Sequence, residues 1–300
     1  MWAFQQDFEE VYELDGRLEK SFNVAEGGFL KVKNVTGYIK VNSWSKNEVK
    51  VIAFERRHRY DDGIARIWIE KRGNKVYVET EYDKYYKRRR SWFKSFRNSF
   101  PGVEYEIVVP EKFSVETSNV TGGVIIKNIK GDVNSETVTG SVEISNVIGN
   151  VFAKTTTGRV RLRRIDGEVD AETTTGSVTI YDSSIPNLRA RTTTGSIDVE
   201  TLSVNPDGRY DLQATTGSLS FAIPSDSRAS LRIKYRGNNF RTDFDLEKYY
   251  YRKERRSGRY FYEDYGRSWK RKTIVDDING GGARVYMETT NGRIELRKLR

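Results

Sequence analysis

The sequence predicts an all-β protein, a single-stranded parallel β-helix or β-solenoid with coils of about 18 residues and two basic, aromatic-rich insertions. Three observations lead to this prediction: a glycine motif recurs every 18 residues, polar and apolar side chains alternate between the glycines, and few residues are apolar. Only 36% of the 300 residues are hydrophobic and 31% are charged. Such a composition fits a thin core, because each coil of a solenoid buries only a few side chains against its neighbours.

The repeat is clearest in the segments VTGGVII, VTGSVEI, TTGRVRL, TTGSVTI, TTGSIDV and TTGSLSF, whose central glycines follow at intervals of 18, 18, 18, 19 and 22 residues. Further glycines halve the interval to nine residues, so each half of a coil is expected to be one strand that ends in a turn. Glycine suits these turns because it tolerates a positive φ. The predicted turn glycines are Gly37, Gly122, Gly131, Gly140, Gly149, Gly158, Gly167, Gly176, Gly195, Gly217 and Gly292.

Alternation within each half favours half-buried strands. In one half, Val151, Ala153 and Thr155 are expected to face the core, and in the next half Val160 and Leu162 do so. The frequent glycines and threonines exclude stable helices.

Charges at matching positions of successive coils alternate in sign. Lys154 falls between Glu136 and Glu172, and Glu172 is followed by Arg191 in the next coil. Such pairs stabilise an in-register stack by about 0.2–1 kcal/mol each. We interpret these charges as holding the register and keeping the surface soluble.

The chain is expected to be one continuous domain in four parts. Residues 1–110 form an N-terminal β region with the first coil around Gly37, strands at 48–56, 64–70 and 75–82, a hairpin turn at Arg72-Gly73-Asn74 and a basic insertion at 84–97. Residues 111–223 form the regular solenoid, residues 224–279 an insertion with a basic aromatic segment at 247–272, and residues 280–300 a closing coil. We expect this last coil to cap the stack, because exposed strand edges invite pairing with other chains.

The two insertions carry the basicity of the chain. Residues 84–97 have a charge of +7 and residues 247–272 a charge of +6, whereas the whole chain is +10, so the remainder is −3. Lysine and arginine interleaved with aromatic residues can bind nucleic acid, an anionic glycan or an anionic membrane surface. The candidate polyanion-binding or partner-binding residues are Lys87, Arg88, Arg89, Arg90, Trp92, Arg97, Arg252, Arg255, Arg256, Arg259, Tyr260, Tyr262, Trp269 and Arg271.

Two other interpretations of the insertions remain open. Their aromatic residues could pack on one another or on the solenoid while lysine and arginine stay solvated. They could also contact the acidic coils of another copy, which would make the partner the chain itself, as a homo-oligomer or filament.

No cofactor or metal is predicted. The chain has no cysteine, which excludes disulfides and thiol chemistry. His58 is the single histidine and is expected to be structural or solvated, since a zinc site or a catalytic triad needs further partners. The turns lack the G-G-x-G-x-D pattern of calcium-binding repeats.

The best candidates for a glycan-cleaving site are the carboxylates Asp166, Glu168, Asp170 and Glu172, the last three of which are expected on one outward face. Lys154, Arg189 and Arg191 would flank them and lower their pKa values. A general acid needs a raised pKa, so an enzyme is the less favoured interpretation.

Threonine triplets precede several turns, at 155–157, 173–175 and 192–194. Their hydroxyls are expected to bond turn backbone groups from coil to coil. Ordering of water or ice on a flat face is the alternative.

Composition does not determine the cellular compartment of the protein. No apolar run reaches the roughly 18 residues that span a bilayer, and the first residues lack the basic and apolar regions of a signal peptide. The protein is therefore either cytoplasmic or an exported mature form without its signal peptide.

A family resemblance is carried by GGFLKVKNVTGYIKVNSW, YEIVVPEKFSVETSNVTGGV, the tandem TTGSV turns and GGGARVYMETTNGRIEL. These segments resemble a bacterial and archaeal family of β-strand-repeat proteins, described as candidate adhesins of largely unknown function. The resemblance implies a parallel β-helix, usually right-handed, that is exported to the cell envelope or surface and has no assigned catalytic residues. The two insertions depart from the family pattern.

Together these observations predict a non-enzymatic envelope or surface protein with an adhesin-like, structural or assembly role and no small-molecule substrate. The main alternative is a polyanion-binding module that acts through the two insertions. A polysaccharide-active β-helix enzyme is the second alternative.

Overall fold

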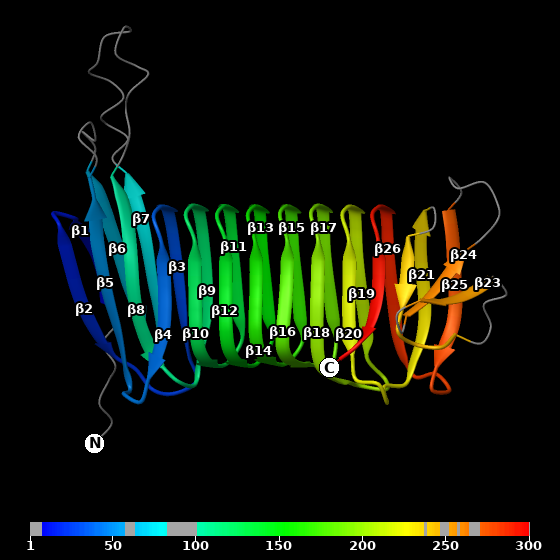
Figure 1. Cartoon of the computed structure of the whole chain (residues 1–300). Helices are drawn as coiled ribbons and strands as arrows, with labels where there is room; N and C mark the ends of the chain where they lie inside the picture. The colour runs from blue at the N-terminus through cyan, green and yellow to red at the C-terminus, as the bar shows by residue number, and fades with distance from the viewer. Residues whose placement is uncertain are drawn as a thin grey trace, which may run out of the picture. The chain divides into compact units, whose positions relative to one another are not determined.

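A computed structural model of the chain describes residues 8–57, 64–82, 101–236, 239–246, 252–256, 259–263 and 271–299. These residues form strands and connecting turns without a helix, in two mostly parallel sheets, A and B, between which the strands alternate from β8 to β22 (Figure 1). The all-β solenoid predicted from the sequence is confirmed, whereas its right-handedness stays a prediction. The chain divides into two compact units, Met1–Glu143 and Ile144–Arg300.

In the first unit, sheet A runs in the order β1-β6-β7-β3-β9-β11 and sheet B in the order β2-β5-β8-β4-β10. The strand β12 (Val142–Ile148) crosses the boundary between the units. The strands of this unit are β1 (Phe8–Glu13), β2 (Arg17–Asn23), β3 (Gly28–Thr36), β4 (Ile39–Trp44), β5 (Glu48–Arg56), β6 (Ala65–Arg72), β7 (Lys75–Tyr82), β8 (Gly102–Pro110), β9 (Phe113–Thr121), β10 (Val124–Lys130) and β11 (Val133–Thr139).

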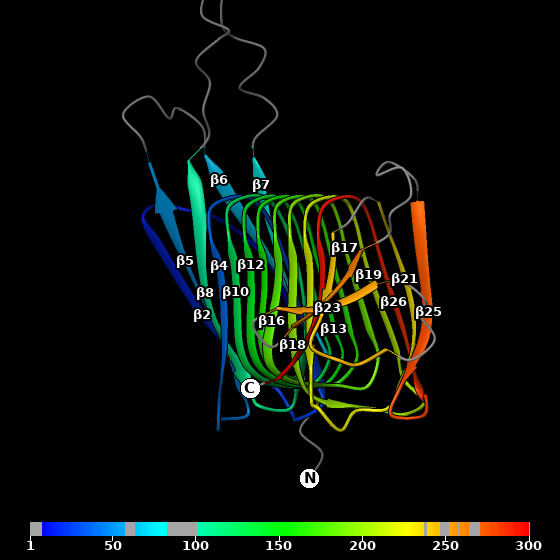
Figure 2. The ribbon, with the colours of Figure 1, turned by 45° about the vertical axis from the view of Figure 1, so that its right-hand side comes forward.

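In the second unit, sheet A runs in the order β13-β15-β17-β19-β26-β21-β25 and sheet B in the order β14-β16-β18-β20-β27-β22-β24-β23. Figure 2 shows these two layers facing each other, from green at β13 and β16 to orange and red at β25 and β26. The strands are β13 (Val151–Thr157), β14 (Val160–Asp166), β15 (Val169–Thr175), β16 (Val178–Ile185), β17 (Leu188–Thr194), β18 (Ile197–Val204), β19 (Arg209–Thr216), β20 (Leu219–Ile223), β21 (Ala229–Arg236), β22 (Phe240–Thr242), β23 (Arg252–Arg256), β24 (Arg259–Glu263), β25 (Arg271–Ile278), β26 (Ala283–Asn291) and β27 (Ile294–Lys298).

The regular coil follows from the nine-residue half-repeat. Each half is a seven-residue strand and a two-residue corner, as in β13, the corner at 158–159, and β14. The parallel register places Val151 beside Val169 and Val160 beside Val178, so in these coils a residue stacks on its equivalent 18 positions on. The predicted inward residues are buried, and each fully buried valine or leucine contributes about 1.5–3 kcal/mol.

The closing coil does not cap the stack, contrary to the prediction. Its strand β26 pairs with β19 on one side and with β21 on the other, and β27 lies between β20 and β22. The residues between β20 and β26 add strands to both sheets beyond it. The predicted hairpin at Arg72-Gly73-Asn74 is confirmed, because β6 and β7 pair antiparallel with Arg72 opposite Lys75.

The outer strands of sheet A place charged groups on their core side. In β1, Glu10 lies opposite the buried Ile69, and the Lys20 ammonium of β2 lies 4.3 Å from the centre of the Tyr12 ring. In β25, Asp276 lies opposite the buried Leu231 and is itself buried. Inward charges oppose the addition of a further strand from another chain.

The corner glycines are restricted by both backbone angle and space. Gly176 has φ +148°, in a region that only glycine occupies readily. A Cβ atom on Gly176 would lie 1.7 Å from the carbonyl oxygen of Gly158 in the preceding coil. The prediction of a positive φ at every turn glycine is wrong at Gly131 and Gly292, where close approach of neighbouring main chain alone excludes a side chain.

A second periodic feature was missed in the sequence. Asn128, Asn146, Arg164 and Asp182 follow at 18-residue intervals in sheet B strands and have φ of +61°, +58°, +53° and +53°. The left-handed residue bends the strand, so Ile165 turns inward one position later than strict alternation predicts. Asn and Asp adopt this conformation more readily than other residues, which makes Arg164 the exception.

The corner geometry predicts a large difference between two glycine-to-alanine changes. Gly176→Ala should lower the free energy of unfolding by about 3 kcal/mol or more, since backbone strain and overlap with main chain both apply. Gly16→Ala is the matched control, because Gly16 has φ +76° but nothing within 4 Å of its added Cβ, and it should cost only about 1–2 kcal/mol. Chemical denaturation compares the two, and equal losses would contradict the account of the corner.

The bend at Arg164 predicts a stabilising substitution. Arg164→Asn should raise the free energy of unfolding by about 0.5–1 kcal/mol, because asparagine tolerates φ +53° better. Arg163→Asn is the control, since it changes the same residue type next door and removes the 3.1 Å ion pair to Asp182. Thermal and chemical denaturation should show a gain in stability only for Arg164→Asn. A loss of stability in that variant would show that the backbone at Arg164 is not strained.

Candidate functional site

Half of the predicted polyanion-binding residues lie outside the part of the chain that the structure describes. This applies to Lys87, Arg88, Arg89, Arg90, Trp92, Arg97 and Trp269, and also to His58. The main chain is described for Arg252, Arg255 and Arg256 in β23, for Arg259, Tyr260 and Tyr262 in β24, and for Arg271 in β25. The β23–β24 hairpin sets Arg255 opposite Tyr260 and Arg256 opposite Arg259. Polyanion binding therefore stays a prediction.

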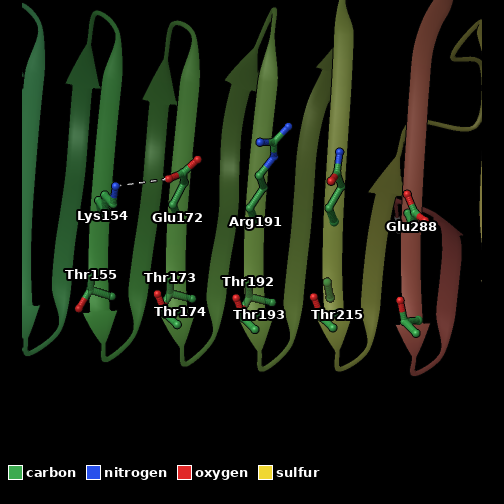
Figure 3. A pocket seen from close by; sticks show the side chains of 13 residues that line it. Lys154, Thr155, Glu172, Thr173, Thr174, Arg191, Thr192, Thr193, Thr215 and Glu288 are labelled. Carbon is green, nitrogen blue, oxygen red and sulfur yellow. Dashed lines mark ion pairs between the residues drawn. The ribbon is translucent and has the colours of Figure 1, made fainter.

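A groove of about 480 Å³ crosses the outer face of sheet A in the second unit (Figure 3). Five neighbouring strands, β13, β15, β17, β19 and β26, supply its lining. One wall, the polar row, consists of Lys154, Glu172, Arg191, Gln213 and Glu288. The other wall, the hydroxyl row, consists of Thr174, Thr193, Thr215 and Thr290.

The two rows follow directly from the parallel register. Glu172 lies beside Arg191, Arg191 beside Gln213 and Gln213 beside Glu288, one residue per strand. Because side chains alternate across a strand, the outward threonine two positions further on forms the second row. The groove therefore repeats with the strand spacing of about 4.8 Å.

The threonine triplets divide into two roles. The inner threonine of a triplet is buried and bonds a corner of the preceding coil, as when the Thr173 hydroxyl donates to the Gly158 carbonyl at 3.2 Å and the Thr192 hydroxyl to the Gly176 carbonyl at 3.1 Å. This confirms the predicted structural role for the inner residues. The middle threonines, such as Thr193, are exposed in the groove instead. The face there is hollowed between two rows of side chains, whereas ordering of ice would need a flat one.

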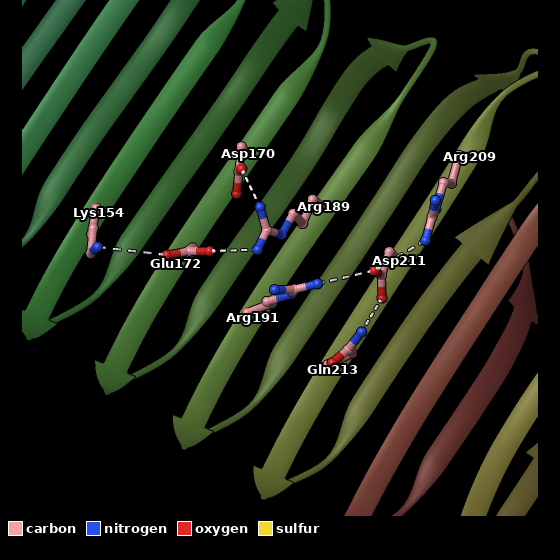
Figure 4. Close-up of polar contacts among 8 residues, drawn as sticks. All are labelled: Lys154, Asp170, Glu172, Arg189, Arg191, Arg209, Asp211 and Gln213. Atoms are coloured by element: carbon pink, nitrogen blue, oxygen red, sulfur yellow. Dashed lines mark hydrogen bonds and ion pairs between the residues drawn. The ribbon is translucent and has the colours of Figure 1, made fainter.

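An ion-pair network above the groove sets the direction of the long side chains (Figure 4). The guanidinium of Arg189 contacts Asp170 at 3.3 Å and Glu172 at 3.5 Å, and Lys154 lies 3.8 Å from Glu172. In the same way, the guanidinium of Arg191 forms an ion pair at 3.3 Å with the carboxylate of Asp211, which is buried. These contacts draw Glu172 and Arg191 away from the hydroxyl row and keep the groove open.

The carboxylates proposed for a glycan enzyme are not arranged as an acid–base pair. Asp166 ends β14, and Glu168 lies in the corner before β15 and accepts a 2.8 Å hydrogen bond from Asn187. Asp170 and Glu172 share one guanidinium, that of Arg189.

The pKa of Asp170 corrects one expectation. Neighbouring cations were expected to lower it, but burial raises the pKa of Asp170 above its ordinary value and outweighs the opposing effect of Arg189. The sequence shows the cations but not the burial of Asp170.

Sequence reasoning missed the far end of the groove, namely Gln213, Glu288 and Thr290. The register between β19 and β26 joins Gln213 to Glu288 across an insertion, so no fixed period connects them in the sequence. The resemblance between TTG at 215–217 and TTNG at 289–292 is the sequence signal that could have identified this end of the groove.

No group of three or more His, Cys, Asp or Glu side chains is placed to hold a metal ion among the described residues. The described part of the chain also contains no helix of the length and hydropathy needed to cross a membrane.

Comparison with known proteins places the chain in a family. No curated protein matches it. Among solved structures, the chain matches a candidate cell adhesion protein from Clostridium sporogenes (14% identity, covering 98% of this chain and 100% of that one, TM-score 0.28) and a candidate adhesin from Bacteroides fragilis (11% identity, 94% and 97%, TM-score 0.42). A family model described as Toastrack DUF4097 matches residues 32–263. Because this match spans more than half of the chain, the protein belongs to the Toastrack DUF4097 family.

Proposed function

We propose that this chain is a non-enzymatic, adhesin-like protein of the cell envelope or surface that holds an extended ligand in the groove of sheet A. The observation that carries the proposal is the groove itself, which crosses five strands and is lined by polar side chains in every one. A site that extends over several repeats suits a long, regular ligand.

The groove is built for binding rather than for chemistry. Glu172 and Arg191 already have ion-pair partners, and the inner threonines are bonded to main chain. Fixed side chains lose little conformational freedom when a ligand arrives, which favours affinity.

Assembly through strand edges is the less favoured role. Glu10 of β1 and Asp276 of β25 point to the core side of the outer strands, which opposes edge pairing between copies. Binding of a polyanion by the two insertions remains a separate proposal, supported by their charge of +13 within a chain of +10.

A charge placed in the groove tests the proposal. Thr193→Lys should reduce binding of the labelled protein to purified cell envelopes of the producing organism at least tenfold, because a lysine side chain fills the centre of the groove. Thr179→Lys is the matched control, since Thr179 lies on the outer face of sheet B beside Asp198, and it should bind like the parent. Equal binding by the parent and both variants would show that the groove is not the binding surface.

The same preparations test the absence of catalysis. Envelope polysaccharide incubated with the parent protein should release no new reducing ends. Release that is lost in Asp170→Asn or Glu172→Gln would instead establish the enzyme alternative.

A further inference from the structure

We infer that the ligand of the groove is an uncharged polysaccharide in an extended conformation, which runs across the strands with one sugar unit per strand. The inference rests on the proposed function and assigns its ligand class. It is carried by the repeat distance, the charge and the hydrogen-bonding groups of the groove.

The repeat distance selects the kind of polymer. Thr174, Thr193 and Thr215 come from neighbouring strands in register, so their hydroxyls recur every 4.7–4.9 Å or so. An extended chain of linked pyranose rings advances by roughly 5 Å per unit, close to this strand spacing. An extended peptide advances about 3.3 Å per residue and each strand of a nucleic-acid duplex about 3.4 Å per nucleotide, so neither matches the row unit for unit.

The charge of the lining excludes a strong preference for a polyanion. The polar row has two cations, Lys154 and Arg191, two anions, Glu172 and Glu288, and one neutral amide, Gln213. A sulfated or phosphorylated chain would lie against both carboxylates. An uncharged chain meets donors and acceptors of both kinds without a repulsive contact.

The hydrogen-bonding groups match sugar hydroxyls. Each threonine hydroxyl offers one donor and two acceptor positions, and sugar hydroxyls offer the same combination. The polar row adds cationic donors, carboxylate acceptors and the amide of Gln213. The groove therefore offers a hydroxyl on one side and a charged or amide group on the other at nearly every strand.

A length series of oligosaccharides tests the inference. Uncharged β-1,4-linked oligomers of glucose and of N-acetylglucosamine, from two to seven units, are titrated into the full chain by calorimetry. Affinity should rise roughly threefold to tenfold with each unit, the equivalent of one hydrogen bond, and level off at five units, since five strands line the groove. Thr193→Val should weaken five-unit binding by a similar factor, whereas Thr179→Val, on sheet B, should leave it unchanged.

Three outcomes would overturn the inference: no binding in either series, affinity that does not depend on length, or tighter binding of a sulfated glycan of equal length at physiological salt. If envelope binding is still lost in Thr193→Lys in any of these cases, the groove is a binding site for a ligand of another class and the proposed function stands. If envelope binding is also unaffected, both proposals fail.

Discussion

Close stacking of main chain at the coil corners is the constraint on which the other features depend. At Gly176 the neighbouring coil leaves no room for even a Cβ atom, whose nearest contact would be 1.7 Å away. Corners this close force equivalent residues of successive coils into register, as Val169 with Leu188 and Thr173 with Thr192. The thin core, the threonine bonds to corner carbonyls and the outward rows all follow from that register.

Because of the same register, side chains on the outer surface of a sheet repeat at the spacing of the strands. A single solvent-facing position becomes a row of side chains about 4.8 Å apart, and the row can differ in chemistry from the next. In the second unit, ion pairs such as Arg191 with Asp211 join rows on the same face. These pairs are partly exposed and contribute little to stability, but they fix the direction of the side chains that border the groove.

Much of the fold could be predicted from the sequence because the strongest local signals and the tertiary arrangement coincide. Glycine spacing and alternation identified the strands of the regular coils and their inward residues, such as Val160 and Leu162. The bend at Arg164 was hidden because arginine is an unusual residue for a left-handed backbone. The position of β26 inside sheet A depends on how a long insertion pairs, which no local pattern records.

The site was less predictable than the fold for the same reason. One threonine of each triplet proved structural, and the distinction between Thr192 and Thr193 follows from burial. The raised pKa of Asp170 likewise depends on packing rather than on nearby charge alone.

A crystal structure of the full chain with a bound uncharged five-unit oligosaccharide tests the central claim most directly. We predict a chain that lies across the strands of sheet A, with successive rings beside Thr174, Thr193 and Thr215. A sugar chain that lies along a strand, or that binds elsewhere on the protein, would contradict the claim that the register of the coils defines the ligand.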